Sequence, residues 1–266
     1  MYKMIVIDID DTLLNDQGEI SNNTKEVIKK VVNKGVMVTL ATGRMYCSTA
    51  RFANDLGIKT AIVSYQGALI KDMQNGQVLY ECSLEANDIK YIMDFCKEEN
   101  LHVQYYSNDI LYTQEDNDKI RNYSKIHDVE YTIEPNVEKL LRAPITKIVI
   151  YEDPEVINQV QDVLSAKLGE RCYITKSKPF FLEILNKEVN KGNAVSFLCQ
   201  IYGYKLDEVM AIGDGWNDYE LLKVAGFSIA VKNAVPELLE IVDYVTDSNN
   251  EDGVMKALKK FILQND

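Results

Sequence analysis

Positive charge is in short supply in this chain of 266 residues. Its 29 lysines and arginines are outnumbered by 41 aspartates and glutamates, which gives a net charge of −12. This balance argues against nucleic acid and anionic membrane surfaces as partners. Long apolar runs are also absent. Because no run reaches about 18 residues we expect no membrane span, and because acidic residues appear by position 8 we expect no signal peptide.

Cysteine and histidine are scarce as well. The five cysteines are scattered, odd in number and without a CxxC pair, which is typical of reduced thiols in a cytoplasmic protein. The two histidines, His102 and His127, lie away from every motif described below, so a histidine-ligated zinc site is not expected. No GxGxxG follows the first apolar stretch, which removes the dinucleotide-binding fingerprint.

The most informative stretch of the chain has two carboxylates two residues apart. Asp8 and Asp10 follow the apolar run 4–7, which predicts a buried parallel strand with both acids at its carboxyl end. Open α/β sheets hold their ligands at that edge. Neighbouring carboxylates repel each other unless a cation or a proton offsets the charge. The pair suits a divalent metal, a nucleophile and a general acid/base, although a strand that simply ends in an acidic turn would look the same.

Three further motifs follow along the chain. The apolar residues 36–41 end in Thr42-Gly43-Arg44, Lys191 opens an amphipathic segment, and the apolar residues 209–212 end in Gly213-Asp214-Gly215-Trp216-Asn217-Asp218. Each has a plain alternative when taken alone. Thr42 suits the N-cap of the next helix, and Arg44 and Lys191 could be solvated surface residues.

Together and in this order, the four motifs resemble those of the haloacid dehalogenase (HAD) superfamily, in particular its Cof-type phosphatases with a C2B cap. The resemblance covers essentially the whole chain. It implies an α/β fold in which a HAD-like Rossmann-type parallel sheet core carries an inserted α/β (C2B) cap domain. A chain of this length suggests two domains. We expect the core at residues 1–81 and 188–266 and the cap at residues 82–187.

The resemblance also implies roles for the catalytic residues. Asp8 would be the nucleophile that forms an aspartyl-phosphate, and Asp10 the general acid/base. Lys191 would neutralise charge on Asp8 and the phosphate, and Thr42 would donate its hydroxyl to a phosphoryl oxygen. The residue types alone do not decide which of the two aspartates attacks.

The cofactor that the resemblance implies is Mg²⁺, which prefers octahedral oxygen ligands. Asp8 and Asp214 would supply carboxylates and Asp10 its backbone carbonyl. Asp218 would not contact the metal through its own carboxylate but would hold a metal-bound water or Lys191.

A separate set of residues is expected at the phosphate. These residues are Asp11, Thr42, Gly43, Arg44, Lys191 and Asn217. Asp11 stands where relatives often have glycine, and its backbone amide would face the phosphate. Gln66 stands where relatives commonly have asparagine, so a polar contact near the substrate differs here.

Alternating strands and helices predict a parallel sheet with right-handed crossovers. Ser21 is the expected N-cap of a helix over residues 22–34, and Ser83 that of a helix over residues 84–99. Between these helices, Asn75-Gly76 is the expected turn of a β-hairpin.

Three function classes fit these patterns. The first is a Mg²⁺-dependent phosphatase of small phosphorylated metabolites, with sugar phosphates as the expected substrates. The second is a phosphotransferase or phosphomutase with the same intermediate, which would need a closed cap that excludes water. The third is a non-catalytic phosphate-binding module, which would not need Asp10. We favour the phosphatase, acting as a monomer or weak homodimer, and the sequence does not identify its substrate.

Overall fold

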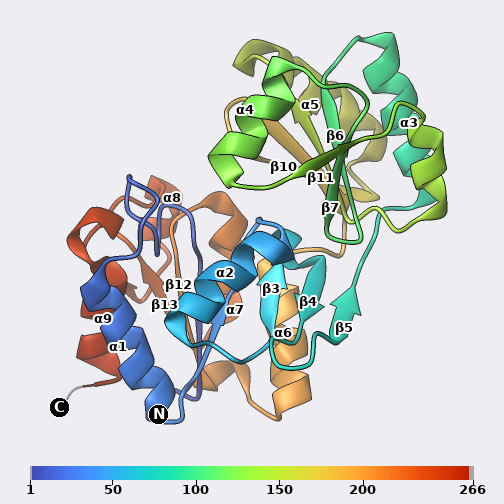
Figure 1. The fold of residues 1–266 in the computed structure, drawn as a ribbon. Helices are drawn as coiled ribbons and strands as arrows, with labels where there is room; N and C mark the ends of the chain where they lie inside the picture. Colours follow the sequence, from blue (N-terminus) through green and yellow to red (C-terminus); the bar gives the residue numbers. More distant parts are fainter. Residues whose placement is uncertain (1, 264–266) are drawn as a thin grey trace. The chain divides into compact units, whose positions relative to one another are not determined.

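The computed structural model describes residues 2–263 and divides into two compact units (Figure 1). Unit 1 contains the described residues up to Leu79 and those from Asn190 onward, and unit 2 contains Tyr80–Val189. These boundaries lie two residues from the predicted domain boundaries. No helix in residues 2–263 is long and apolar enough to cross a membrane.

Unit 1 is built on a parallel five-stranded sheet with the order β14-β13-β12-β1-β2. Its strands are β1 (Met4–Ile7), β2 (Met37–Leu40), β12 (Val209–Gly213), β13 (Phe227–Ala230) and β14 (Tyr244–Val245). Ile7 of β1 pairs with Ile212 of β12 and with Leu40 of β2. The residues that follow these three strands are therefore brought to one edge of the sheet.

The helices of unit 1 begin and end at recognisable signals. They are α1 (Asn22–Asn33), α2 (Tyr46–Leu56), α6 (Lys191–Tyr202), α7 (Tyr219–Val224), α8 (Pro236–Leu239) and α9 (Gly253–Phe261). The Ser21 side chain accepts a hydrogen bond from the Thr24 amide and caps α1, as predicted. Gly57 ends α2 in the left-handed conformation. Helices α1 and α9 lie side by side (Figure 1), and their apolar faces join those of β1 and β12 in one core.

A small three-stranded sheet, with the order β3-β4-β5, continues from the main sheet of unit 1. It consists of β3 (Ile62–Ser64), β4 (Leu69–Lys71) and β5 (Val78–Glu81), and a single turn of 3₁₀ helix, η1 (Tyr65–Gly67), joins β3 to β4. The predicted hairpin is present, since the Asp72 amide donates to the Gln77 carbonyl across the turn at Asn75-Gly76. A parallel bridge between Ala41 and Val63 ties β3 to the end of β2.

Unit 2 has its own six-stranded sheet, with the order β10-β11-β9-β6-β7-β8. The strands are β6 (Val103–Ser107), β7 (Ile110–Thr113), β8 (Tyr131–Ile133), β9 (Lys147–Tyr151), β10 (Cys172–Lys178) and β11 (Phe181–Asn186). Helices α3 (Ala86–Glu98) and α5 (Pro154–Leu168) share an apolar core with one face of this sheet. Helix α4 (Asp118–His127) contacts the other face, where the hydroxyls of Tyr123 and Tyr106 are hydrogen-bonded.

Two local predictions in unit 2 differ from the structure. Helix α3 begins at Ala86 after Glu85, without a side-chain cap, so Ser83 is not its N-cap. The reason is that Leu84 donates its amide to Ile145, which keeps the chain extended there. Strand β8 was not predicted, although residues 129–134 alternate between apolar and polar side chains; its own residues are partly or fully exposed.

Candidate active site

The edge of the unit 1 sheet gathers the acidic residues of the first and last motifs. Asp8 directly follows β1, and its amide donates to the Ile212 carbonyl of β12 at 3.0 Å. Asp214 directly follows β12. Carboxylate oxygens of Asp8, Asp214 and Asp218 all lie within 4.8 Å of one another. Residues that are more than 200 positions apart in the chain thus form one cluster.

Lys191 lies at the centre of this cluster. It is the first residue of α6, whose N-cap Asn190 accepts a hydrogen bond from the Asn193 amide at 2.7 Å. The Lys191 side chain is fully buried, and its Nζ lies 2.5 Å from Asp8 Oδ1 and 2.6 Å from Asp218 Oδ1. Burial acts to lower the pKa of Lys191, but the charges of Asp218 and Asp8 outweigh it and raise that pKa. The ammonium therefore stays charged.

Asp218 holds two parts of the site together. While Oδ1 accepts from Lys191, Oδ2 accepts from the backbone amides of Asp214 at 3.0 Å and Gly215 at 3.1 Å. A Cβ on Gly213 would lie 2.6 Å from Asp218 Cγ, so only glycine fits at that position. Both Asp218 oxygens are thus engaged by protein groups.

Asp214 accepts a hydrogen bond from Thr12 Oγ1 at 2.5 Å. Burial, and then the charge of Asp218, raises the pKa of Asp214 to about 7. No role was predicted for Thr12. The sequence signal that could have identified Thr12 is its position two residues after Asp10, from which its side chain reaches Asp214 at the end of the neighbouring strand β12.

Asp8 is in a similar environment. Burial raises the pKa of Asp8 well above its usual range, and the charges of Asp218 and Asp214 add to the effect while Lys191 opposes it. Three clustered carboxylates with one ammonium leave an excess of negative charge. Hard oxygen donors with such an excess fit a divalent cation such as Mg²⁺.

Asp10 has a different partner. Arg44 Nε donates to Asp10 Oδ2 at 2.8 Å, and one terminal nitrogen of Arg44 donates to Oδ1 at 2.6 Å. The Asp10 side chain is still 47% exposed, whereas Arg44 is 14% exposed and stacks over Phe52. The fork of the guanidinium fixes the orientation of an accessible carboxylate. Arg44 was predicted at the phosphate, and the structure shows it on Asp10.

Thr42 and Gly43 lie beside this pair, at the end of β2. Thr42 is buried, and its Oγ1 accepts from the Arg44 amide at 3.2 Å. The alternative that Thr42 caps the next helix is wrong, because the N-cap of α2 is Met45. Thr42 therefore shapes the loop rather than the helix start.

Asp11 has a φ of 58°, in the left-handed region. Glycine is favoured there, and aspartate is among the other residues that tolerate this conformation, which explains why Asp11 can stand where relatives often have glycine. The side chain of Asp11 is exposed, and its carbonyl accepts from Asn233 Nδ2 at 2.7 Å. Asn233 was not predicted, and no motif in the sequence identifies it.

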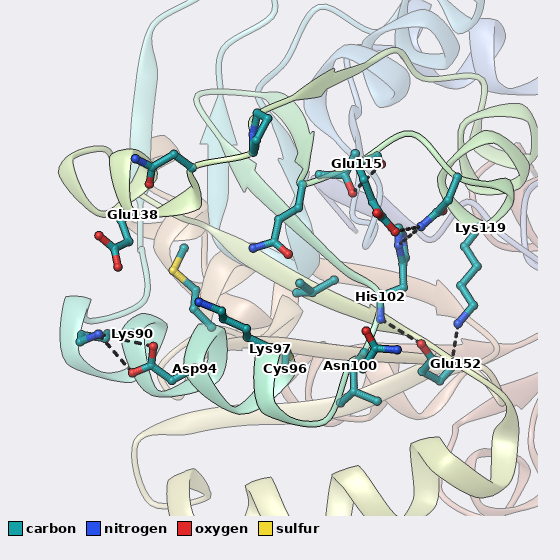
Figure 2. Close-up of a pocket in the computed structure, with 18 of the residues that line it drawn as sticks. Lys90, Asp94, Cys96, Lys97, Asn100, His102, Glu115, Lys119, Glu138 and Glu152 are labelled. Carbon is teal, nitrogen blue, oxygen red and sulfur yellow. Dashed lines mark hydrogen bonds and ion pairs between the residues drawn. The ribbon is translucent and has the colours of Figure 1, made fainter.

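A separate pocket of about 720 Å³ lies within unit 2 (Figure 2). None of the predicted site residues lines it. Lys119 and Glu152 form an ion pair at its wall. The backbone amide of His102 donates to Glu152, and the His102 ring nitrogen Nδ1 contacts Asn117 Nδ2. Burial, and then the charge of Lys119, lowers the pKa of His102 to about 4. The imidazole is therefore neutral, and in residues 2–263 neither histidine belongs to a cluster that could hold a metal.

The sequence matches a family model described as haloacid dehalogenase-like hydrolase over residues 5–258. The chain belongs to this family. It is 32% identical to the putative phosphatase YxeH of Bacillus subtilis, over 99% of both chains. It is 28% identical to the 5-amino-6-(5-phospho-D-ribitylamino)uracil phosphatase YcsE of the same organism, over 98% of this chain and 96% of the relative.

Among solved structures, the crystal structure of TM0651 from Thermotoga maritima has a TM-score of 0.89 with this chain. The two chains are 32% identical, and the match covers 98% of each. The predicted superfamily, the α/β fold with its inserted unit, and the enzyme class of HAD-type phosphatases are therefore confirmed.

Proposed function

We propose that this HAD-type phosphatase hydrolyses small phosphorylated metabolites, sugar phosphates in particular, through an aspartyl-phosphate on Asp8 and with Mg²⁺. The observation that carries the proposal is the buried cluster in which Lys191 bridges Asp8 and Asp218 beside Asp214. Lys191 would favour the charged form of Asp8 for attack and would then offset the charge of the phosphoryl oxygens.

In the first step, an oxygen of Asp8 would attack phosphorus and the bond from phosphorus to the leaving oxygen would break. Asp10 would give its proton to that oxygen. In the second step, Asp10 would remove a proton from water, which would attack phosphorus and release Asp8 and inorganic phosphate. The accessible Asp10 carboxylate, held in orientation by Arg44, supports the second step, in which an ionised Asp10 accepts a proton from water.

The proposed metal ligands are Asp8 and Asp214 through their carboxylates and Asp10 through its backbone carbonyl. When bound, Mg²⁺ would offset the negative charge of the cluster and of the transferring phosphoryl group. Asp218 would act indirectly, since its oxygens already accept from Lys191 and from the amides of Asp214 and Gly215.

The remaining motif residues would bind the phosphoryl oxygens. They are the Asp11 and Gly43 amides, the Thr42 hydroxyl, Lys191, Asn217 and Arg44. For the leaving group, YcsE supports a polyhydroxylated substrate, because the compound in its name carries phosphate on a ribityl chain.

The proposal also covers the cellular location of the enzyme, its partners and its oligomeric state. In the described residues, no disulfide joins any of Cys47, Cys82, Cys96, Cys172 and Cys199, which supports a cytoplasmic location. The net charge of −12 supports the absence of nucleic-acid and membrane partners. The enzyme would act as a monomer or weak homodimer.

A substrate screen tests the proposal. The purified protein with Mg²⁺ is incubated with a panel of sugar phosphates, polyol phosphates, nucleotides and p-nitrophenyl phosphate, and released phosphate is measured. We expect release from sugar or polyol phosphates by the wild type and none by Asp8→Asn. Release from no member of the panel would refute the phosphatase proposal, and release from nucleotides alone would refute the substrate class.

A further inference from the structure

The turn after β3 has an unusual backbone. Tyr65 and Gln66 are consecutive residues with positive φ, 51° and 59°, followed by Gly67 at 108°. Side chains other than glycine, and bulky ones above all, adopt this region at a cost in free energy. Both side chains are nevertheless buried, with Tyr65 0% and Gln66 2% exposed. Strained, buried backbone persists where the surroundings fix it, and it gathers at functional sites.

Two backbone hydrogen bonds hold this turn against the loop after β2. The Tyr65 amide donates to the Arg44 carbonyl at 3.0 Å, and the Gln66 amide donates to the Thr42 carbonyl at 2.9 Å. The turn is therefore tied on both sides of Gly43.

The Gln66 side chain then joins this loop to the one after β12. Its Oε1 accepts from Asn217 Nδ2 at 3.1 Å. On the other side, a Cβ on Gly43 would lie only 2.4 Å from Gln66 Nε2. The amide thus packs directly on the backbone of Gly43 while it holds Asn217.

Gly67 brings the same turn against the start of α6. A Cβ on Gly67 would lie 2.5 Å from the carbonyl oxygen of Asn190, the residue that caps α6 immediately before Lys191. One turn of three residues therefore contacts the three other segments that carry motif residues Thr42 to Arg44, Asn217 and Lys191.

We infer that Gln66 is a positioning residue of the active site, whose amide sets the separation between Gly43 and Asn217 and so the space that receives the phosphoryl group. This inference rests on the proposed function, because it assigns the space to phosphate. Reacting groups must be held closely, and a displacement of about 1 Å can lower the rate about 10²-fold. A side chain that fixes two of the phosphate-contacting loops should therefore control turnover without touching the reacting atoms.

The test compares Gln66→Ala with Gln74→Ala, a matched control at an exposed glutamine between β4 and β5. The kcat and KM for p-nitrophenyl phosphate are measured with Mg²⁺, far below the unfolding temperature of each variant, and inorganic phosphate binding is measured by calorimetry. We expect Gln66→Ala to lower kcat/KM by about 10- to 100-fold and to weaken phosphate binding, with Gln74→Ala at the wild-type level. Gln66→Asn, which keeps the amide but shortens its reach, should lie in between and serves if Gln66→Ala does not fold.

Two double variants separate positioning from a general loss of stability. Gln66→Ala and Asn217→Ala should be non-additive in kcat/KM, since each removes the same contact. Gly43→Ala should lose activity through its contact with Gln66, and adding Gln66→Ala should restore part of it. Additive losses, no restoration, or wild-type values for Gln66→Ala would overturn the inference alone. A wild-type protein that neither turns over p-nitrophenyl phosphate nor binds phosphate would overturn the proposed function, and the inference with it.

Discussion

Two buried lysines, one in each unit, are surrounded by very different charge. Lys191 of unit 1 is fully buried, and its Nζ lies within 2.6 Å of both Asp8 and Asp218, with Asp214 in the same cluster. This cluster has more carboxylates than ammonium groups, so its negative charge is not balanced from within the cluster.

Lys147 of unit 2 forms an ion pair with Glu183, with 3.6 Å between Nζ and Oε1, and it lies over the Tyr106 ring at 4.9 Å from the centroid. Both charged side chains are buried. Taking charges out of water is costly in both units, but a matched pair offsets that cost locally. The contrast indicates that the excess charge of unit 1 is kept for an ion and a substrate, whereas the pair in unit 2 can be explained by stability alone.

The largest effect is expected from removing the Asp8 carboxylate of the unit 1 cluster. Asp8→Asn should abolish phosphate release, because an amide neither attacks phosphorus nor binds a metal as a carboxylate does. Turnover of p-nitrophenyl phosphate measures this, with Asp162→Asn, an exposed position on α5, as the matched control. Thermal unfolding should show that both variants fold. Comparable turnover in Asp8→Asn would rule out the covalent step.

Removal of the metal should leave the negative charge of the unit 1 cluster without a balancing cation. A chelator should therefore abolish phosphate release. The folded pKa of Asp214, about 7, lies above its ordinary value of 3.8, so protonated Asp214 favours the folded state. That stabilisation is present below about pH 4 and is lost as the pH rises through about 7.

Mg²⁺ should therefore raise the unfolding temperature of the metal-free protein more at pH 8 than at pH 5, because it replaces the proton at high pH. Differential scanning fluorimetry at both values measures this. In Asp214→Asn the difference between the two pH values should shrink. A Mg²⁺ effect that is equal at both values in the wild type would contradict the assignment of Asp214.

The ion pair of unit 2 should respond in stability. Lys147→Met leaves the Glu183 carboxylate buried without this partner, and such a break costs about 3–5 kcal/mol. Lys147→Met with Glu183→Leu should recover most of that loss, because it removes both charges. Chemical denaturation measures both variants. If the double variant were no more stable than the single one, the pair would not be the self-contained unit that the comparison suggests.

Asp10 gives a smaller effect than Asp8 because it moves a proton rather than forming a bond to phosphorus. Asp10→Asn should lower turnover of an alkyl phosphate by about 10²-fold. With p-nitrophenyl phosphate, whose leaving group needs little protonation, the aspartyl-phosphate should accumulate and appear in the intact mass after a rapid acid quench. Absence of this species, with unchanged turnover, would remove Asp10 from the proposed mechanism.

Much of this site could be predicted from the sequence, for one physical reason. Apolar strands of a parallel sheet end at the same edge, so Asp8, Thr42 and Asp214 had to come close once their strands were recognised. The start of α1 after Ser21 and the hairpin turn at Asn75-Gly76 were also predicted, since a capping serine and an Asn-Gly pair are strong local signals.

What could not be predicted depends on where side chains point after the strands end. Arg44 bonds to Asp10, Thr12 to Asp214 and Gln66 to Asn217, and each pairing is set by loop backbone rather than by strand or helix period. Gln66 shows this best, because its direction follows from a positive φ that no sequence pattern signals for a glutamine. The start of α3 was missed for a similar reason, since a long-range bond from Leu84 decides it.

The smallest effect is expected at His102, a buried titratable group of unit 2 outside the Lys147 pair. Asn117 Oδ1 accepts from the Ile120 amide as the N-cap of α4, so its Nδ2 is turned to His102 Nδ1 at 3.1 Å. Gln104 Nε2 lies 3.3 Å from His102 Nε2, so an amide nitrogen faces each ring nitrogen, and a doubly protonated imidazole could accept from neither. The lowered pKa of about 4, caused by burial and then by Lys119, against an ordinary value of 6.5, agrees with that geometry.

Because the folded pKa lies below the unfolded one, neutral His102 stabilises the fold above about pH 6.5, and this contribution is lost as the pH falls toward 4. Between pH 6.5 and 5 the loss should reach about 2 kcal/mol. Proton NMR of the imidazole signals measures the pKa, and His127→Gln assigns them because the chain has two histidines. A His102 pKa near 6.5 in the folded protein would mean that unit 2 leaves this ring open to water, so that its buried polar groups are less firmly held than the unit 1 cluster.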